Sequence, residues 1–287
     1  MIVEENMEIS VETNTGWDPR IVSIKCGDLV RAYLIKTEKF VVVYDTLLGP
    51  KSGGFLKERA LELAEGRKLI VVNSHSDWDH YFGNMVFDEP ILSTEMMIKR
   101  IASGLGRKEL DKKRKEHPES YQDVVLTSPT IGLPAYASLH GGDLTVELTL
   151  VKGHRPDHLC LYIPEIATVL PGDCVEDPIP LVDEESDEKS RTLTEFIDTL
   201  HRFLRVQPKW VLANHAAPQE GVARVEANLA YLENIQLQAR QAQSLDQLIA
   251  ENPASQEWDT FYQGAHRNNL RMAWQQTRSE SRKWAED

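Results

Sequence analysis

The spacing of hydrophobic positions changes along the chain, and each period predicts a different element. Residues 20–44 contain three short runs rich in β-branched and aromatic side chains, which predicts a three-stranded meander. Between 55 and 65 the apolar residues recur at helical spacing, and Gly66 follows where a glycine commonly ends a helix. The apolar run 68–73 predicts a further strand. Residues 40–73 are therefore expected to form a strand–helix–strand unit with two parallel strands.

The middle of the chain is expected to form a helical excursion on the surface. Ser93 can cap a helix that begins at Thr94. The pattern from 95 to 123 is helical and highly charged, with breaks near Gly104 and at Pro118.

Strands dominate the pattern that follows. Residues 143–150 alternate between polar and apolar side chains, as in a strand with one buried face. The runs 159–163 and 167–170 predict a hairpin, 192–204 an amphipathic helix, and 210–214 the last strand. Mixed sheets with helices outside would bury such a series.

The length fits one large domain or a domain with an appendage, because 287 residues can build a sizeable core. We place a domain at 1–218, including the helical excursion at about 94–123, and a C-terminal helical extension at 219–287. The extension is expected to pack against the domain as extra helices. Covering the active site and forming a homodimer through these helices are the alternatives.

Charge and composition argue against nucleic-acid and membrane partners. The formal net charge is −13, whereas binding to a nucleic-acid backbone needs clustered Lys and Arg, so no nucleic-acid partner is expected. No apolar stretch approaches the roughly 20 residues of a membrane helix, so no membrane partner is expected. The acidic start, MIVEENMEISVE, lacks a secretory leader, and Cys26, Cys160 and Cys174 form no spaced pair. These features favour a cytoplasmic protein with reduced, mostly buried thiols.

Seven metal-capable side chains follow apolar runs. Residues 75–80, HSDWDH, come directly after the strand predicted at 68–73. Three more His or Asp residues stand just after other predicted strands, so all seven are expected at one edge of the sheets. Each alone would more often be a turn or surface residue, but together they match the ligands of Zn²⁺ and related ions. The candidates are His75, Asp77, Asp79, His80, His154, Asp173 and His215.

In this combination the chain resembles the metallo-β-lactamase fold hydrolases. That family carries a His-x-His-x-Asp-His loop, then Gly-His, Gly-Asp and a final His. This chain has HSDWDH at 75–80, Gly-His at 153–154, Gly-Asp at 172–173 and His215 in the same order. The resemblance covers roughly residues 20–218. It implies an α/β (α+β) fold, a four-layered αβ/βα sandwich of two mixed β-sheets with outer helices, and metal ions at one edge between the sheets.

The resemblance also implies a dinuclear site with two divalent metal ions. Asp79 would both ligate and move a proton to the leaving group. Asp45, after the strand at 40–44, is either an acceptor that fixes an imidazole tautomer or a turn residue that caps the strand. By the resemblance, the first ion would take His75, Asp77 and His154, the second Asp79, His80 and His215, and Asp173 would bridge them.

Asp77 departs from the family, which usually has His at this place. An Asp side chain reaches about 1–2 Å less far than an imidazole, by standard bond lengths. Direct ligation by Asp77 is the expectation, and ligation through a water or a weak first site are the alternatives. Flavodiiron proteins, which resemble this loop, have a glutamate there and hold iron. Zinc is the default ion, while an oxygen-rich site also suits iron or manganese.

The predicted function is a metal-dependent hydrolase that uses a metal-bound hydroxide on a small ester, thioester, lactone, amide or phosphoester. No Ser or Cys nucleophile is required for this chemistry. An iron-dependent oxidoreductase acting on oxygen or a sulfur compound is the alternative, and a non-catalytic binder is a third. The partner is expected to be a small-molecule substrate, whose identity the fold does not reveal.

Overall fold

The structure is a computed structural model that describes residues 7–182 and 192–286. The chain folds into two compact units, and each unit is built from two separate segments of the sequence. The described residues form two β-sheets, as predicted, and these have seven and six strands. The first unit comprises Met1–Leu150 and Asp157–Gly172, and the second comprises Val151–Pro156 and Asp173–Asp287.

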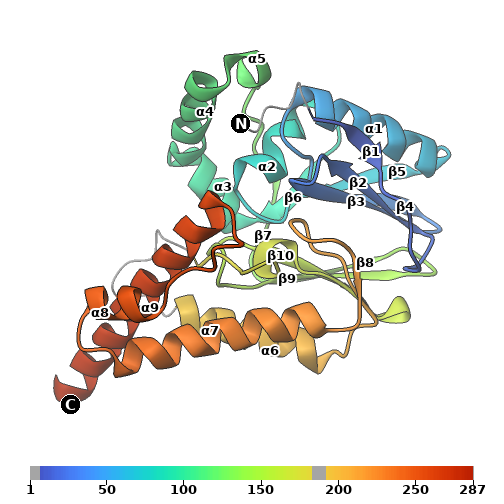
Figure 1. Cartoon of the computed structure of the whole chain (residues 1–287). Coiled ribbons are helices and arrows are strands. Elements are labelled where there is room, and N and C mark those ends of the chain that lie inside the picture. The colour runs from blue at the N-terminus through green and yellow to red at the C-terminus, as the bar shows by residue number, and fades with distance from the viewer. Residues whose placement is uncertain (1–6, 183–191, 287) are drawn as a thin grey trace. The chain divides into compact units, whose positions relative to one another are not determined.

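The first unit contains the seven-stranded sheet. Its strands lie in the order β1 (Ile9–Val11), β2 (Ile21–Cys26), β3 (Val30–Lys36), β4 (Phe40–Tyr44), β5 (Lys68–Val72), β6 (Ile91–Thr94) and β7 (Ile131–Leu133). Strands β1 to β4 are antiparallel, and β4 to β7 are parallel. The helix α1 (Pro50–Ala64) connects β4 to β5, so the predicted meander and strand–helix–strand unit are confirmed (Figure 1). Leu56 and Ala60 of α1 share one hydrophobic core with Val41 and Val43 of β4.

The excursion between β6 and β7 is helical, as predicted. It consists of α3 (Glu95–Ala102), α4 (Leu105–Glu116) and α5 (Pro118–Tyr121). Gly104 separates α3 from α4 with a φ of 92°, a left-handed conformation that glycine adopts without steric cost.

The cap predicted at Ser93 is wrong by one residue. Thr94 is the N-cap of α3, and its Oγ1 accepts a hydrogen bond from the backbone N–H of Met97 at 3.0 Å. Ser93 points elsewhere, because its hydroxyl donates to the carbonyl of Asn73 at 2.9 Å.

Four more strands of the first unit pair antiparallel with one another. They are β8 (Tyr136–His140), β9 (Thr145–Leu150), β10 (Leu159–Ile163) and β11 (Thr168–Leu170). The alternating strand and the hairpin predicted here are confirmed. The hydroxyl of Tyr44 donates to the carbonyl of Leu159 at 2.8 Å, and Leu159 N–H donates to the carbonyl of Ser74 at 2.7 Å. These bonds hold β10 beside the loop that follows β5.

The second unit is mostly helical. Its elements are α6 (Thr192–Arg205), β12 (Trp210–Val211), β13 (Gln219–Glu220), α7 (Ala223–Gln241), α8 (Leu245–Glu251) and α9 (Thr260–Glu286). The helical C-terminal region predicted from the sequence is confirmed, whereas the strand predicted at 210–214 has only two residues. Those two residues pair with β13, and the chain then leaves the pairing toward His215. The domain boundary predicted between 218 and 219 stays a prediction.

Side-chain amides join the C-terminal helices to the segment that follows Asp173. Asn228 of α7 accepts from the backbone N–H of Glu176 at 2.9 Å and donates to its carbonyl at 3.0 Å. Asn269 of α9 accepts from the N–H of Val182 at 2.9 Å. Asn228 and Asn269 are both buried, so these bonds satisfy backbone groups that water cannot reach.

No helix among the described residues combines the length and the apolar character needed to cross a lipid bilayer. The first six residues, on which the expectation about a leader partly rests, lie outside the described residues.

Candidate metal centre

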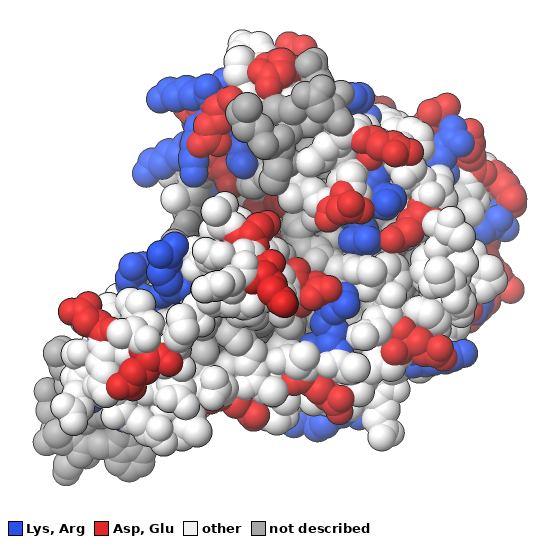
Figure 2. Space-filling view, viewed as in Figure 1, with Lys and Arg blue, Asp and Glu red and all other residues white. Residues whose placement is uncertain are grey.

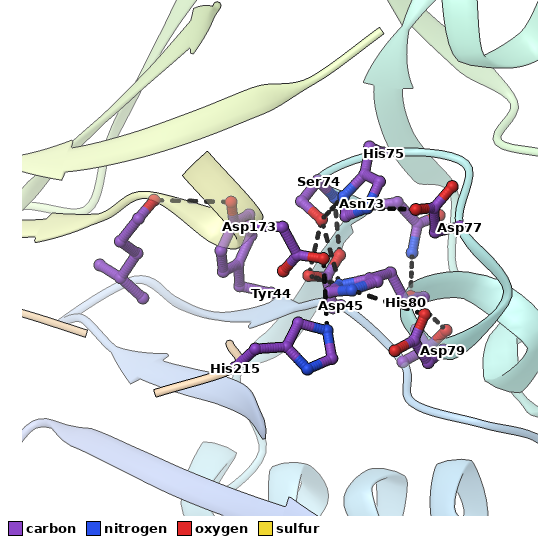
Figure 3. Close-up of polar contacts among 12 residues, drawn as sticks. Tyr44, Asp45, Asn73, Ser74, His75, Asp77, Asp79, His80, Asp173 and His215 are labelled. Carbon is purple, nitrogen blue, oxygen red and sulfur yellow. Dashed lines mark hydrogen bonds and ion pairs between the residues drawn. The ribbon is translucent and has the colours of Figure 1, made fainter. Parts of the chain in front are cut away.

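Four of the predicted ligands lie in the loop that follows β5 in the first unit. His75 is fully buried on an extended stretch, and Asp77, with φ −76° and ψ 143°, is the extended residue that precedes α2 (Trp78–Tyr81). Asp79 and His80 are buried on the first turn of that short helix. The change from strand to helix therefore turns all four side chains toward one region of the first unit (Figure 3).

In two pairs of side chains in this loop, the ligand atoms lie farther apart than in a typical hydrogen bond. His75 Nε2 lies 3.5 Å from Asp77 Oδ2, and His80 Nε2 lies 3.7 Å from Asp79 Oδ1. Hydrogen bonds between such groups have lengths of about 2.7–3.2 Å. The rings of His75 and His80 are 4.2 Å apart between centroids. Two imidazoles and two carboxylates are thus gathered with their ligand atoms just beyond hydrogen-bonding range.

Asp45, at the end of β4, fixes His80. Its Oδ2 lies 2.8 Å from His80 Nδ1 and accepts the hydroxyl of Ser74 at 2.7 Å, while its Oδ1 accepts Ser74 N–H at 2.6 Å. A carboxylate beside Nδ1 holds the proton on that nitrogen and leaves Nε2 in the form that ligates a metal. Of the two interpretations of Asp45, the structure supports the acceptor that fixes a tautomer (Figure 3).

His75 is oriented by its surroundings in the first unit. Its Nδ1 lies 2.9 Å from Ser74 Oγ, which places Nε2 on the side of Asp77. The buried ring of His158 stacks on His75 with 4.6 Å between centroids and 14° between planes. Both contacts restrict rotation of the His75 ring.

The remaining three predicted ligands lie in the second unit. Gly153 has a φ of 139°, and a side chain there would overlap the ring of Phe196, so glycine is required directly before His154. His154 Nε2 lies 3.6 Å from Asp173 Oδ2, and His215 Nε2 lies 3.3 Å from the same oxygen. Two imidazole nitrogens therefore face one buried carboxylate oxygen.

Glu176 and Tyr262 join this group and were not predicted. Glu176 Oε1 lies 3.7 Å from His154 Nδ1, and the Tyr262 hydroxyl donates to Glu176 Oε2 at 3.4 Å. His154, Asp173 and Glu176 each offer a ligand atom within 4.8 Å of the others. Burial raises the pKa of Tyr262, and the charges of Glu176 and Asp173 raise it further, so this phenol stays protonated at neutral pH. Neither residue belongs to a recognisable motif, so the sequence held no signal for them.

Arg100 of α3 contacts the loop between His75 and Asp77. Its Nε donates to Ser76 Oγ at 3.0 Å and lies 3.7 Å from Asp157 Oδ2. Asp157 is fully buried, and a buried carboxylate needs a nearby cation. The helical excursion thus supports the loop between His75 and Asp77, which its charged sequence did not reveal.

The separations fit metal ligation within each unit. Two ligands on one tetrahedral ion, at metal–ligand distances of about 2.0–2.2 Å, lie about 3.3–3.5 Å apart. Each of the seven predicted residues has a predicted partner in its own unit at 3.3–3.7 Å. The chain therefore contains His/Asp clusters that could hold a metal ion. The assignment of each residue to an ion stays a prediction.

Comparisons with known proteins give a fold and a family match. The metallo-beta-lactamase superfamily model matches residues 27–215. A beta-lactamase domain protein from Burkholderia ambifaria is similar in structure, with 15% identity, a TM-score of 0.68 and coverage of 96% of this chain and 91% of that chain. A metallo-beta-lactamase from Pontibacter korlensis has 15% identity, a TM-score of 0.54 and coverage of 79% and 94%.

A double mutant of the sec-alkyl sulfatase PisA1 is also similar, with 15% identity, a TM-score of 0.64 and coverage of 91% of this chain and 49% of that chain. At such identities the likeness to solved structures shows the fold alone. No curated protein matches the chain.

Proposed function

Since the chain belongs to the metallo-β-lactamase superfamily, we propose that it is a metal-dependent hydrolase. The proposed substrate is a small ester, thioester, lactone, amide or phosphoester. The proposed site holds two divalent ions, with zinc as the default, on the seven predicted ligands.

One observation carries this proposal: imidazole nitrogens and carboxylate oxygens recur at 3.3–3.7 Å in both units. Ion pairs at the exposed surface can have similar separations, as His201 and Glu233 do at 3.5 Å. The pairs in the two units differ because their side chains are at most 17% exposed and lie beside further imidazoles and carboxylates, and their separations fit two ligands of one cation. The short contact of His80 Nδ1 with Asp45, at 2.8 Å, supports the same conclusion because it aims the opposite nitrogen at the ligand group.

Divalent ions at this site would supply a water of lowered pKa and a positive charge that polarises the reacting bond. The side chains of the protein would do the rest. Asp79, which is 6% exposed, would accept the proton of the attacking water and pass it to the leaving group. Asp45 and Ser74 would hold the imidazoles in the ligating tautomer and orientation.

The test compares two histidine variants on a panel of chromogenic esters, thioesters, lactones and phosphoesters, supplied with zinc, manganese or iron. His80→Ala should abolish turnover and lower the metal content while circular dichroism stays unchanged. His201→Ala is the matched control, because His201 is 45% exposed and pairs with Glu233 at 3.5 Å. Wild-type turnover in His80→Ala would refute the proposal.

An iron-dependent oxidoreductase is the second candidate, and Asp77 is the residue that favours it. Its Oδ2 lies 3.5 Å from His75 Nε2, so the proposed first ion would have a carboxylate where the family usually has His. Oxygen ligands suit iron and manganese better than an all-imidazole site does. Iron in the purified protein, with visible absorbance and oxygen-dependent turnover, would favour this second function over hydrolysis.

A further inference from the structure

Lys113 is a partly buried lysine whose ammonium group lies against the metal-binding loop. Its Nζ lies 3.6 Å from the ring centroid of Trp78. Lys113 is on α4, and Trp78 is the first residue of α2, between Asp77 and Asp79. The ring is also in edge contact with Tyr121, at 5.7 Å, so it forms a fixed apolar wall beside the ammonium group.

The ammonium group of Lys113 differs from its neighbours because it makes no hydrogen bond or ion pair with any residue that the structure describes. Lys112 pairs with Glu116 at 4.0 Å, and Arg114 donates to the carbonyl of Val124 at 2.7 Å. Burial lowers the pKa of Lys113, whereas the charges of Asp79, Glu109 and Glu116 act in the opposite direction. None of these carboxylates forms a close ion pair with the partly desolvated ammonium group, so an anion that contacts it directly would gain more here than at the open surface.

The helix that presents Lys113 is basic in an otherwise acidic chain. The sequence of α4, LGRKELDKKRKE, has six Lys or Arg and three Asp or Glu, a balance of 6 − 3 = +3. The whole chain has −13. Figure 2 shows Lys and Arg side chains gathered over α4. The local field therefore attracts anions to the helix that lies against the metal-binding loop.

We propose that Lys113 binds an anionic group of the substrate, with Trp78 as the apolar wall of the same subsite. This inference rests on the proposed hydrolase function and adds a substrate class. The substrate is a small hydrolysable molecule that carries a carboxylate, sulfate or phosphate group in addition to the bond that is cleaved. Lys113 selects by charge, so it contributes to substrate binding and not to the chemical step.

Two esters that differ in charge test the proposal: mono-4-nitrophenyl glutarate, an anion, and 4-nitrophenyl butyrate, which is neutral. Lys113→Met keeps the apolar stem but removes the charge. It should lower kcat/KM for the anionic ester about tenfold, mainly through KM, and change the neutral ester by less than about twofold. Lys113→Arg should restore most of the loss. Lys112→Met is the matched control: it removes the same charge from α4, but the Lys112 side chain is 72% exposed, so it should change either ester by less than about twofold.

An equal loss for both esters in Lys113→Met, or an unchanged KM for the anionic ester, would overturn the proposal. Calorimetric titration of glutarate into the metal-loaded protein gives a second readout that needs no turnover. Glutarate should bind about tenfold more weakly to Lys113→Met than to Lys112→Met, because any binding to metal is common to both. If wild type hydrolyses neither these two esters nor any substrate of the panel above but this difference holds, the proposed function fails and the anion site stands. Equal binding to both variants would rule out the anion site.

Discussion

Asp45 occupies a left-handed backbone conformation, with φ 64°, at a fully buried position. Asp and Asn tolerate this region better than most residues do. The conformation turns the carboxylate back along the chain, so that it meets both His80 Nδ1 and the Ser74 N–H. One strand-end residue thereby sets the direction of an imidazole 35 positions later.

Asp45→Asn should weaken zinc binding about 10- to 100-fold, the usual effect of losing a carboxylate behind a ligating imidazole. The amide has nearly the same shape, so the loss would come from charge and from the tautomer of His80. Competition with a chromophoric chelator measures it. Asp28→Asn is the control, because the Asp28 side chain is 97% exposed. Equal zinc affinity in the two variants would make Asp45 a turn residue only.

At the scale of single residues, the sequence indicated the candidate ligands that belong to a motif. It gave no indication of the residues that contact them from distant positions in the chain. The seven candidate ligands follow strands, so their positions could be inferred from the pattern of strands. Glu176, Tyr262 and Arg100 reach their partners through tertiary contacts: Tyr262 is 86 positions from Glu176, and Arg100 is 24 positions from Ser76. No local pattern encodes such pairs.

Among the elements, the short 3-10 helix after α2, Phe82–Val86, closely approaches the backbone of Thr46. A side chain at Gly83 would overlap the backbone carbonyl of Thr46. This close approach lets Thr46 N–H donate to the carbonyl of His80 at 2.9 Å, which brings the Asp45 turn to the metal-binding loop. Glycine is needed at position 83 because a side chain there would meet the backbone of Thr46, which cannot rotate out of the way as a side chain can.

Gly83→Ala should therefore lower the free energy of unfolding by about 3 kcal/mol, at the upper end for overpacking. Gly54→Ala is its counterpart inside α1, where a new methyl group would meet nothing within 4 Å. That variant should gain about 0.5–1 kcal/mol from helix propensity. Urea denaturation of the two variants measures both changes, and coincident midpoints would contradict this account.

Elements with long, regular patterns were predictable, whereas the short strands β6 and β7 were not. Strands β2 to β5 and the helices α3 and α4 of the excursion each span five or more residues. Strand β6 has four residues and β7 has three, which is too few to show alternation. Their pairing with longer neighbours makes them strands, since Val71 and Val72 of β5 set the register of β6. Tertiary context therefore decided these elements.

For the whole molecule, the proposal predicts that ligands from each unit contribute to stabilisation by metal. Zinc at 100 times its Kd should stabilise the wild type by about 2.7 kcal/mol, which is roughly 5–10 °C in Tm. His80→Ala in the first unit and His154→Ala in the second should each reduce this shift. His201→Ala should retain it. A full shift in His154→Ala, seen by calorimetric scanning, would show that the second unit holds no metal.

The amides of Asn228 and Asn269 have a consequence for how the protein is made. They complete the hydrogen bonds of Glu176 and Val182, so the segment beside Asp173 has no finished surroundings until α9 has left the ribosome. Translation delivers the His75 loop before the helices that hold the segment after Asp173. The nascent polypeptide therefore carries four of its seven candidate ligands before that segment can settle, so any metal that Asp173 helps to hold would be loaded only after α9 has been made.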